Sequence, residues 1–204
     1  MAISDETTTA ITGHELLYIL ESAAGGGVDR ARDLLNLPPK EDSHPWLGAG
    51  LSSLYVRQLV KVANDTVELV GAAALVGLVI TSDANWIELA FVSESATDAA
   101  LLVRFDDIAL LFSPRLFGTF DVRAVSPELS DQALAKVVFG FLLDGPGVVF
   151  AHQVSNTSDS AVAIRLTTEG MLEMSDGDGS DLLSDKVDGG RPYVKQYLTE
   201  VFAR

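Results

Sequence analysis

Residues that could carry acid–base or metal chemistry are few in this chain and widely separated. There are three histidines, His14, His44 and His152, and no cysteine. No two histidines have the H-x-x-x-H spacing that places both imidazoles on one helical face, so a metal site would need all three to converge. We therefore predict that the histidines are ordinary surface or half-buried residues and that the chain binds no metal or other cofactor.

An aspartate-rich stretch near the C-terminus is the best candidate for a set of cation ligands. It begins with Asp176, Asp178 and Asp181. A calcium loop of the EF-hand type needs a glycine at its sixth position and a glutamate at its twelfth. Counted from Asp176, these positions hold Asp181 and Val187, so the template fails at both. The stretch is interpreted as a solvated loop.

The motifs of the common enzyme classes do not occur in the sequence. It contains no G-x-x-x-x-G-K-[ST] phosphate loop, no G-x-S-x-G elbow and no G-x-G-x-x-G between a strand and a helix. The adjacent acids Asp106 and Asp107 lie at a predicted hairpin tip, where neighbouring side chains point apart. We predict no catalytic residues. An enzyme would require His152 or carboxylates to converge with an arginine in a cleft.

Composition and charge limit the partners. The 204 residues include 14 Lys and Arg against 29 Asp and Glu, which gives a net charge of −15. A nucleic-acid surface needs clustered basic residues to neutralise phosphates, and anionic membranes need the same, so we predict neither kind of partner. With 48% hydrophobic residues the chain can form a sizeable core.

Compartment is suggested by three weaker signals. The absence of cysteine fits the reducing cytoplasm. The first residues, Met-Ala-Ile-Ser-Asp-Glu, are acidic where a secretion signal would be basic. The longest uncharged apolar run, Leu69 to Ile80, is too short to span a bilayer and predicts a buried helix. We therefore expect a cytoplasmic protein without membrane insertion.

Apolar periodicity and capping signals predict helices in the first part of the chain. Thr12 and Glu15 have capping-box spacing, and Gly25-Gly26-Gly27 ends the helix that follows. Segments 60–62 and 66–68 suit a small hairpin or the start of a helix. Ser126-Pro127 opens a later helix with a hydroxyl cap and an N-terminal proline. The predicted helices cover about residues 13–23, 29–35, 46–59, 67–80 and 127–142.

Alternating apolar residues predict strands from about residue 85. Asp106-Asp107 joins two of these strands in a tight hairpin. The predicted strands cover residues 86–92, 100–105, 108–112, 119–125 and 148–154, followed by a hairpin of 161–167 with 171–174. The element order indicates an α+β fold, an antiparallel sheet meander packed against several helices.

The chain is divided as follows. We predict a flexible N-terminal lead at residues 1–11, a single α+β domain at 12–174, an acidic flexible loop at 175–190, and a C-terminal helix that packs on the domain at 191–204. Each boundary follows a change in composition or a glycine-rich or polar break.

The connection between two predicted strands carries the most interesting candidate for a binding site. It carries Leu116 and Phe117, although loops are usually polar, and Phe120 follows at the start of the next predicted strand. These three residues are the candidate partner contact. The alternative is that they fold under the sheet as part of the core.

Several segments together resemble the EspG family of chaperones of actinobacterial type VII secretion. They are the helix Thr12 to Glu21, the segment Leu51-x-x-Leu54-x-x-Arg57-x-Leu59-Val60 with the apolar helix after it, and the strands at 86–92, 100–112 and 119–125 with the Ser126-Pro127 helix. The likeness covers roughly residues 12–150 and concerns element order and residue character. It implies an acidic, mixed α/β cytosolic chaperone without a catalytic site. This chain departs from the pattern in being shorter and in its Asp-rich tail, and no client-contacting residue can be carried over.

The leading hypothesis is a non-enzymatic cytosolic binding protein, a chaperone or adaptor for secreted proteins, whose partner is a protein client. The alternative is a small-molecule-binding or regulatory domain with a pocket between the sheet and the helix at 127–142. An enclosed apolar cavity beside His152 or Arg104 would favour that alternative. The oligomeric state is left open, with a dimer as one possibility.

Overall fold

The structure is a computed structural model of the chain that describes residues 8–23, 25–64, 66–126, 130–143, 146–154, 159–166 and 172–176. The chain divides into two compact units, whereas the sequence predicts one domain over residues 12–174. The first unit contains the described residues up to Ala84 together with Val103–Ala124. The second contains Asn85–Leu102 and the described residues from Val125 onward.

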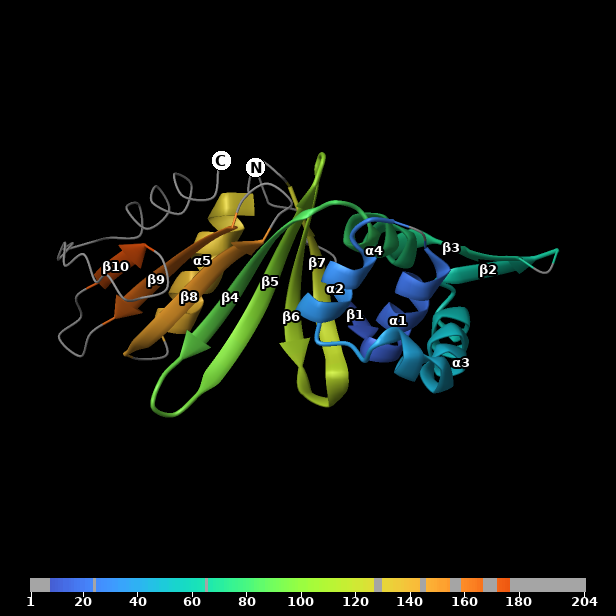
Figure 1. The fold of residues 1–204 in the computed structure, drawn as a ribbon, viewed down its shortest axis with the longest axis horizontal. Helices are drawn as coiled ribbons and strands as arrows, with labels where there is room; N and C mark the ends of the chain where they lie inside the picture. Colours follow the sequence, from blue (N-terminus) through green and yellow to red (C-terminus); the bar gives the residue numbers. More distant parts are fainter. Residues whose placement is uncertain are drawn as a thin grey trace. The chain divides into compact units, whose positions relative to one another are not determined.

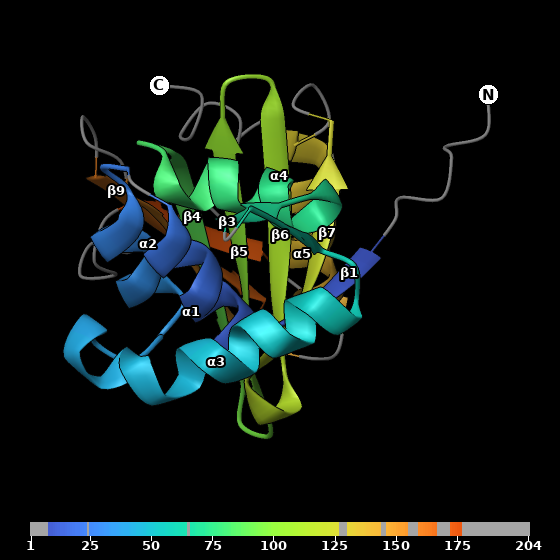
Figure 2. The ribbon, with the colours of Figure 1, turned by 90° about the vertical axis from the view of Figure 1, so that its right-hand side faces the viewer.

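Among the described residues of the first unit, four helices pack on one face of a group of paired strands. The strands are β1 (Thr8–Thr12), β6 (Ile108–Arg115) and β7 (Thr119–Val125), in the order β1-β7-β6, with the end of β5 (Thr97–Phe105) beside β6. The helices are α1 (Gly13–Ser22), α2 (Val28–Leu34), α3 (Lys40–Val56) and α4 (Gly71–Thr81). Figures 1 and 2 show these helices on one face of β6 and β7. A separate two-stranded hairpin, β2 (Val60–Ala63) with β3 (Thr66–Leu69), follows α3.

In the described part of the second unit, a helix packs on an antiparallel sheet. Its strands follow the order β5-β4-β8-β9-β10, where β4 is Asn85–Val92, β8 is Gly147–Val154, β9 is Asp159–Leu166 and β10 is Leu172–Asp176. Helix α5 (Ser130–Leu143) packs on the sheet through Phe141, whose ring stacks on that of Phe91 at 5.6 Å between centroids. Gly147 lies against Phe91, where a Cβ would come within 2.6 Å of the ring.

The predicted fold class, α+β with an antiparallel sheet meander packed against several helices, is confirmed. The core of the first unit comes from the apolar stripes of α1 and α4 and from the inward residues of β6. The fully or nearly fully buried members include Leu16, Leu17, Ile19, Leu20, Val79, Ile80 and Phe112. Among the described residues, no helix combines the length and apolar character that crossing a bilayer requires.

The capping box at the start of α1 is confirmed. The backbone N–H of Glu15 donates to the hydroxyl of Thr12 at 3.2 Å, and the backbone N–H of Thr12 donates to the Glu15 carboxylate at 2.8 Å. Strands β4 to β8 and the β9–β10 hairpin also lie where alternation predicts them. The hairpin is the correct interpretation of segments 60–62 and 66–68.

Four local predictions are corrected. Residues 8–11 belong to β1, because they pair with β7 instead of fraying as a lead. Helix α3 begins at Lys40, directly after Pro39, and includes Pro45 instead of starting after it. Helix α2 begins at Val28, one residue earlier than expected, and residues 67–69 form β3 instead of the first turn of α4.

Some predictions fall partly or wholly outside the described residues. The aspartate-rich stretch is described only through Asp176, where it forms the end of β10 instead of a loop. The remainder of the 175–190 loop, the C-terminal helix at 191–204, residues 1–7 and the Ser126-Pro127 cap beyond Ser126 lie outside the described part.

Helices α2 and α3 end in the same hydrogen-bonding motif, which turns the chain sharply. After α3, the N–H of Gln58 donates to the Tyr55 carbonyl at 3.0 Å and the N–H of Leu59 donates to the Leu54 carbonyl at 2.8 Å. This is a Schellman motif, in which the residue after the C-cap adopts a left-handed conformation. Gln58 does so with φ of 59°, and Asn36 does so after α2 with φ of 50°.

Gln58→Gly should stabilise the protein, because glycine adopts a positive φ without the steric cost that a β-carbon adds. We expect a gain of about 0.5 kcal/mol, since the greater freedom of glycine in the unfolded chain offsets part of the relief. Urea denaturation of the two proteins measures the difference. Gln58→Ala, which keeps the β-carbon, is the control and should not gain stability. Equal midpoints for Gln58→Gly and Gln58→Ala would contradict the assignment of strain to this position.

Candidate functional site

Each of the three histidines has a separate environment. His14, near the start of α1, stacks on Trp46 of α3 with 4.9 Å between ring centroids and an interplanar angle of 3°. His44 is exposed on α3. In the second unit, Nδ1 of His152 on β8 lies 3.3 Å from a carboxylate oxygen of Glu88 on β4. Within the described ranges, no three side chains of the metal-binding types come together.

The β6–β7 connection exposes two apolar side chains to solvent. They are two of the three residues that the sequence analysis gives as the candidate partner contact. Leu116 is 79% exposed and Phe117 is 98% exposed. They lie in a one-turn 3₁₀ segment, Leu116–Gly118. Phe117 has a φ of 62°, in the left-handed region that bulky residues rarely adopt. The phenylalanine therefore stands in solvent on a backbone conformation that costs about 1–3 kcal/mol.

Phe120, the third predicted contact, belongs to the core. It is 8% exposed, pairs with Ile11 of β1, and meets Phe112 edge-to-face with 6.5 Å between centroids. The alternation of β7 explains its position, because Thr119 and Asp121 point to the other face. The sequence hypothesis is therefore corrected for Phe120, and the exposed part of the connection is Leu116 and Phe117. We call these two residues the apolar turn.

The β2–β3 hairpin carries a second exposed apolar surface, which the sequence analysis missed. Val62 and Val67 are directly opposite each other in the hairpin and are 56% and 38% exposed. The next pair on the same face, Val60 with Leu69, lies at the base, where Val60 is 5% exposed. The face of the hairpin that is buried at the base therefore stays apolar toward the tip of the hairpin, where it is exposed to solvent.

The other face of the hairpin is polar. Lys61 lies opposite Glu68, and Ala63 lies opposite Thr66. Two further exposed apolar residues precede the hairpin on α3, Tyr55 at 60% and Val56 at 80% exposure. We call Val62 and Val67 the hairpin apolar face. The only sequence signal for it was the alternation of valines with charged residues in two short segments, which also fits a strand with one buried face.

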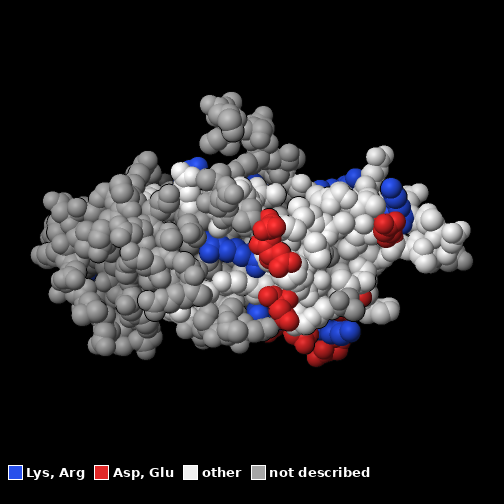
Figure 3. Space-filling view, turned by 90° about the horizontal axis from the view of Figure 1, so that it is seen from above, with Lys and Arg blue, Asp and Glu red and all other residues white. Residues whose placement is uncertain are grey.

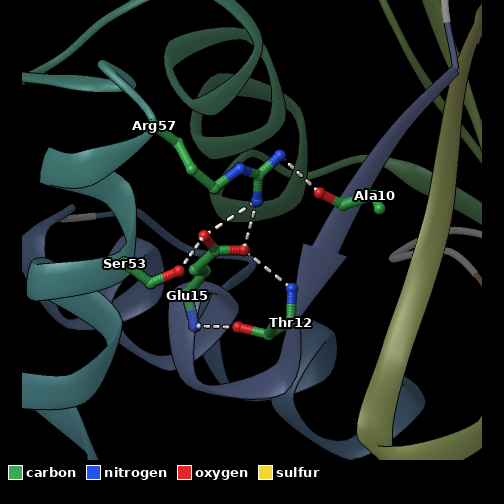
Figure 4. Close-up of polar contacts among 5 residues, drawn as sticks. All are labelled: Ala10, Thr12, Glu15, Ser53 and Arg57. Atoms are coloured by element: carbon green, nitrogen blue, oxygen red, sulfur yellow. Dashed lines mark hydrogen bonds and ion pairs between the residues drawn. The ribbon is translucent and has the colours of Figure 1, made fainter.

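A buried carboxylate fixes the helix end from which the hairpin emerges (Figure 4). Glu15 has no solvent exposure. Its oxygens accept hydrogen bonds from the Ser53 hydroxyl at 2.7 Å and from Nη1 of Arg57 at 2.8 Å to each oxygen, in addition to the capping bond from Thr12. Nη2 of Arg57 donates to the carbonyl of Ala10 on β1 at 2.7 Å.

A second ion-pair group lies at the other end of α1. Arg32 of α2 pairs with Glu21 and donates to the carbonyl of Pro38 at 2.6 Å, while Lys40 lies 3.5 Å from Glu21. Arg32 is 6% exposed, so this largely buried group ties α2 and the start of α3 to α1. On α1 between the two groups, burial raises the pKa of the Tyr18 hydroxyl, so it stays protonated.

The described surface carries no broad basic area on the face shown in Figure 3, where basic side chains stand in small groups, several of them beside acidic ones. This agrees with the net charge of −15. Among the described residues, the candidate site thus combines the two ion-pair groups with the apolar turn and the hairpin apolar face.

No protein-family model matches the chain, and no curated protein matches it either. A solved structure does resemble it, that of EspG5, a chaperone of the type VII secretion system of Mycobacterium tuberculosis, in complex with a PE25–PPE41 dimer. The similarity covers 96% of this chain and 95% of that chain with a TM-score of 0.61, at 10% sequence identity. The two chains therefore share a fold, which confirms the expected resemblance at the level of structure.

Proposed function

We propose that this protein is a non-enzymatic chaperone or adaptor that binds a protein client, and that the client is a secreted protein held in the cytoplasm before export. The observation that carries the proposal is the exposure of apolar side chains on ordered backbone, at the apolar turn and on the hairpin apolar face. The shared fold with a secretion chaperone that binds a protein dimer supports the same class of function.

The mechanism is the temporary covering of an apolar client surface. Phe117, almost fully exposed, can insert into a pocket of the client, and an aromatic residue buried in this way contributes strongly to affinity. Val62 and Val67 extend an apolar face beyond the core and add a flat contact area. The acidic remainder of the protein keeps the complex soluble.

The first experiment identifies the client and then measures its affinity. A tagged chain is used to capture partners from a lysate of the source organism, and the recovered partner is purified and titrated against variants. Phe117→Asp and Val62→Asp should each weaken binding at least about tenfold, because an introduced charge would be buried in the interface.

Two matched controls carry the same added charge at exposed sites outside these patches. Ala63→Asp adjoins Val62 on the opposite face of the hairpin, and Ser95→Asp lies in the exposed β4–β5 connection. Both should bind like the natural chain. Failure to recover any stoichiometric partner would count against the proposal and favour a screen for small-molecule ligands. A partner that binds all four variants equally would place the contact elsewhere.

A further inference from the structure

The orientation of the β2–β3 hairpin is fixed mainly by contacts at its base. Two paired strands of four residues do not form an independently stable sheet in water. At the base, Val60 is buried, the N–H of Val70 donates to the Leu59 carbonyl at 2.9 Å, and Leu69 lies against Gly77 of α4. The angle at which the hairpin leaves the unit therefore depends on two supports, the contact of Leu69 with α4 and the way in which the end of α3 is fixed.

Arg57 fixes that end. It is the C-cap of α3, three residues before β2, and precedes the left-handed Gln58. One guanidinium nitrogen contacts both oxygens of Glu15 and the other contacts the carbonyl of Ala10, so a single planar group joins α3 to α1 and to β1. The Glu15 end cannot move, because its carboxylate is buried and also accepts bonds from Ser53 and Thr12.

From this geometry we propose that the Glu15–Arg57 pair is a positioning device that holds the β2–β3 hairpin at a fixed angle, and so presents the hairpin apolar face for binding. The pair makes no contact with the client itself. The inference rests on the proposed function only in the last step, because the effect on the hairpin can be measured without a client.

Arg57→Lys is the informative substitution. It keeps a positive charge near the buried carboxylate, so the core of the unit remains folded. A single ammonium cannot reproduce the planar fork that reaches the carboxylate and the Ala10 carbonyl from two separate nitrogens. The bond to β1 is therefore lost, and the end of α3 gains freedom to pivot.

The measurement uses pairs of spin labels, which the absence of native cysteine makes straightforward. One pair joins the hairpin to α1, with cysteines at the exposed positions Glu68 and Ser22. The reference pair joins α3 to α1, with cysteines at Ser52 and Ser22. Pulsed electron paramagnetic resonance then gives the distribution of distances for each pair.

In Arg57→Lys the distance distribution of the hairpin pair should broaden at least about twofold, while that of the reference pair keeps its mean and width. Arg115→Lys is the matched control, since Arg115 pairs with Asp121 at 2.7 Å across the apolar turn, and it should leave both distributions unchanged. An unchanged hairpin distribution in Arg57→Lys would overturn the proposal. Equal broadening of both pairs, or loss of the fold, would also overturn it, because the ion pair would then be a general structural bond.

A binding measurement separates this inference from the proposed function. With the recovered client, Arg57→Lys should weaken binding several-fold although Arg57 lies outside both apolar patches. Hairpin broadening without any loss of affinity would leave the positioning role of the pair intact and exclude the hairpin apolar face from the client interface.

Discussion

Gly50→Ala should destabilise the protein by about 3 kcal/mol, because the added methyl group has no room between two helices. A Cβ at Gly50 would lie 2.1 Å from the carbonyl oxygen of His14 and 3.0 Å from the Cβ of Tyr18, both on α1. The nearest atoms are backbone, so no side-chain rotation relieves the clash and α1 must move away from α3. The His14–Trp46 stack and the Glu15–Arg57 pair join the same two helices and would be strained by that movement.

Gly48→Ala is the control for this prediction, because it makes the same change two residues earlier in the same helix. No atom lies within 4 Å of a Cβ at Gly48, so the substitution should stabilise the protein by about 0.5–1 kcal/mol through helix propensity. Urea denaturation followed by tryptophan fluorescence, to which Trp46 on α3 and the buried Trp86 both contribute, measures both variants. Equal stabilities for the two variants would mean that α1 and α3 do not approach as closely as described.

Local signals in the sequence were sufficient to predict those helices, strands and turns that are specified by residues close together in the chain. Thr12 and Glu15 predict the start of α1 because the capping box involves residues only three apart. The turn at Asp106, with φ of 47°, likewise follows from local chemistry, since aspartate tolerates a left-handed conformation. The resulting α+β fold class could therefore be predicted from the chain alone.

Elements that depend on distant partners could not be predicted in this way. Strand β1 is short and mostly polar, and it forms because it pairs with β7, which follows it by more than a hundred residues. Pro45 suggested a break at a position where α3 continues, because the helix already begins after Pro39 and the proline removes only one hydrogen bond near its first turns.

The candidate site was predicted only in part, for a related reason. Apolar residues such as Leu116 and Phe117 are unusual in a connection, and this could be seen in the sequence. Their exposure, however, depends on where β6 ends and β7 begins, and Phe120 is in the core because it already belongs to β7. The capping role of Glu15 was visible in the sequence, whereas its pairing with Arg57 joins residues 42 positions apart. No spacing rule connects two such residues, so the pair becomes apparent only from the fold.

Arg57→Met should destabilise the protein by about 3 kcal/mol, because it leaves the buried carboxylate of Glu15 without its cation. Glu15 has no solvent exposure, so water cannot replace the lost partner at its oxygens. Glu15→Gln in the same background removes the charge. With its amide oxygen at the Oε2 position it still accepts from the Thr12 N–H, and its amide NH2 at the Oε1 position can donate to the Ser53 hydroxyl oxygen. The double variant should therefore be more stable than Arg57→Met alone, by about 1–2 kcal/mol.

Denaturation of the natural chain, both single variants and the double variant gives the coupling energy of the pair. The apolar stem of the introduced methionine keeps most of the packing of the arginine side chain, so the comparison isolates the charge. Additive effects of the two substitutions would show that water screens the pair, which the 35% exposure of the Arg57 side chain allows only at its outer end. A large coupling would instead establish that a buried interaction joins α1 to the end of α3, from which the hairpin emerges.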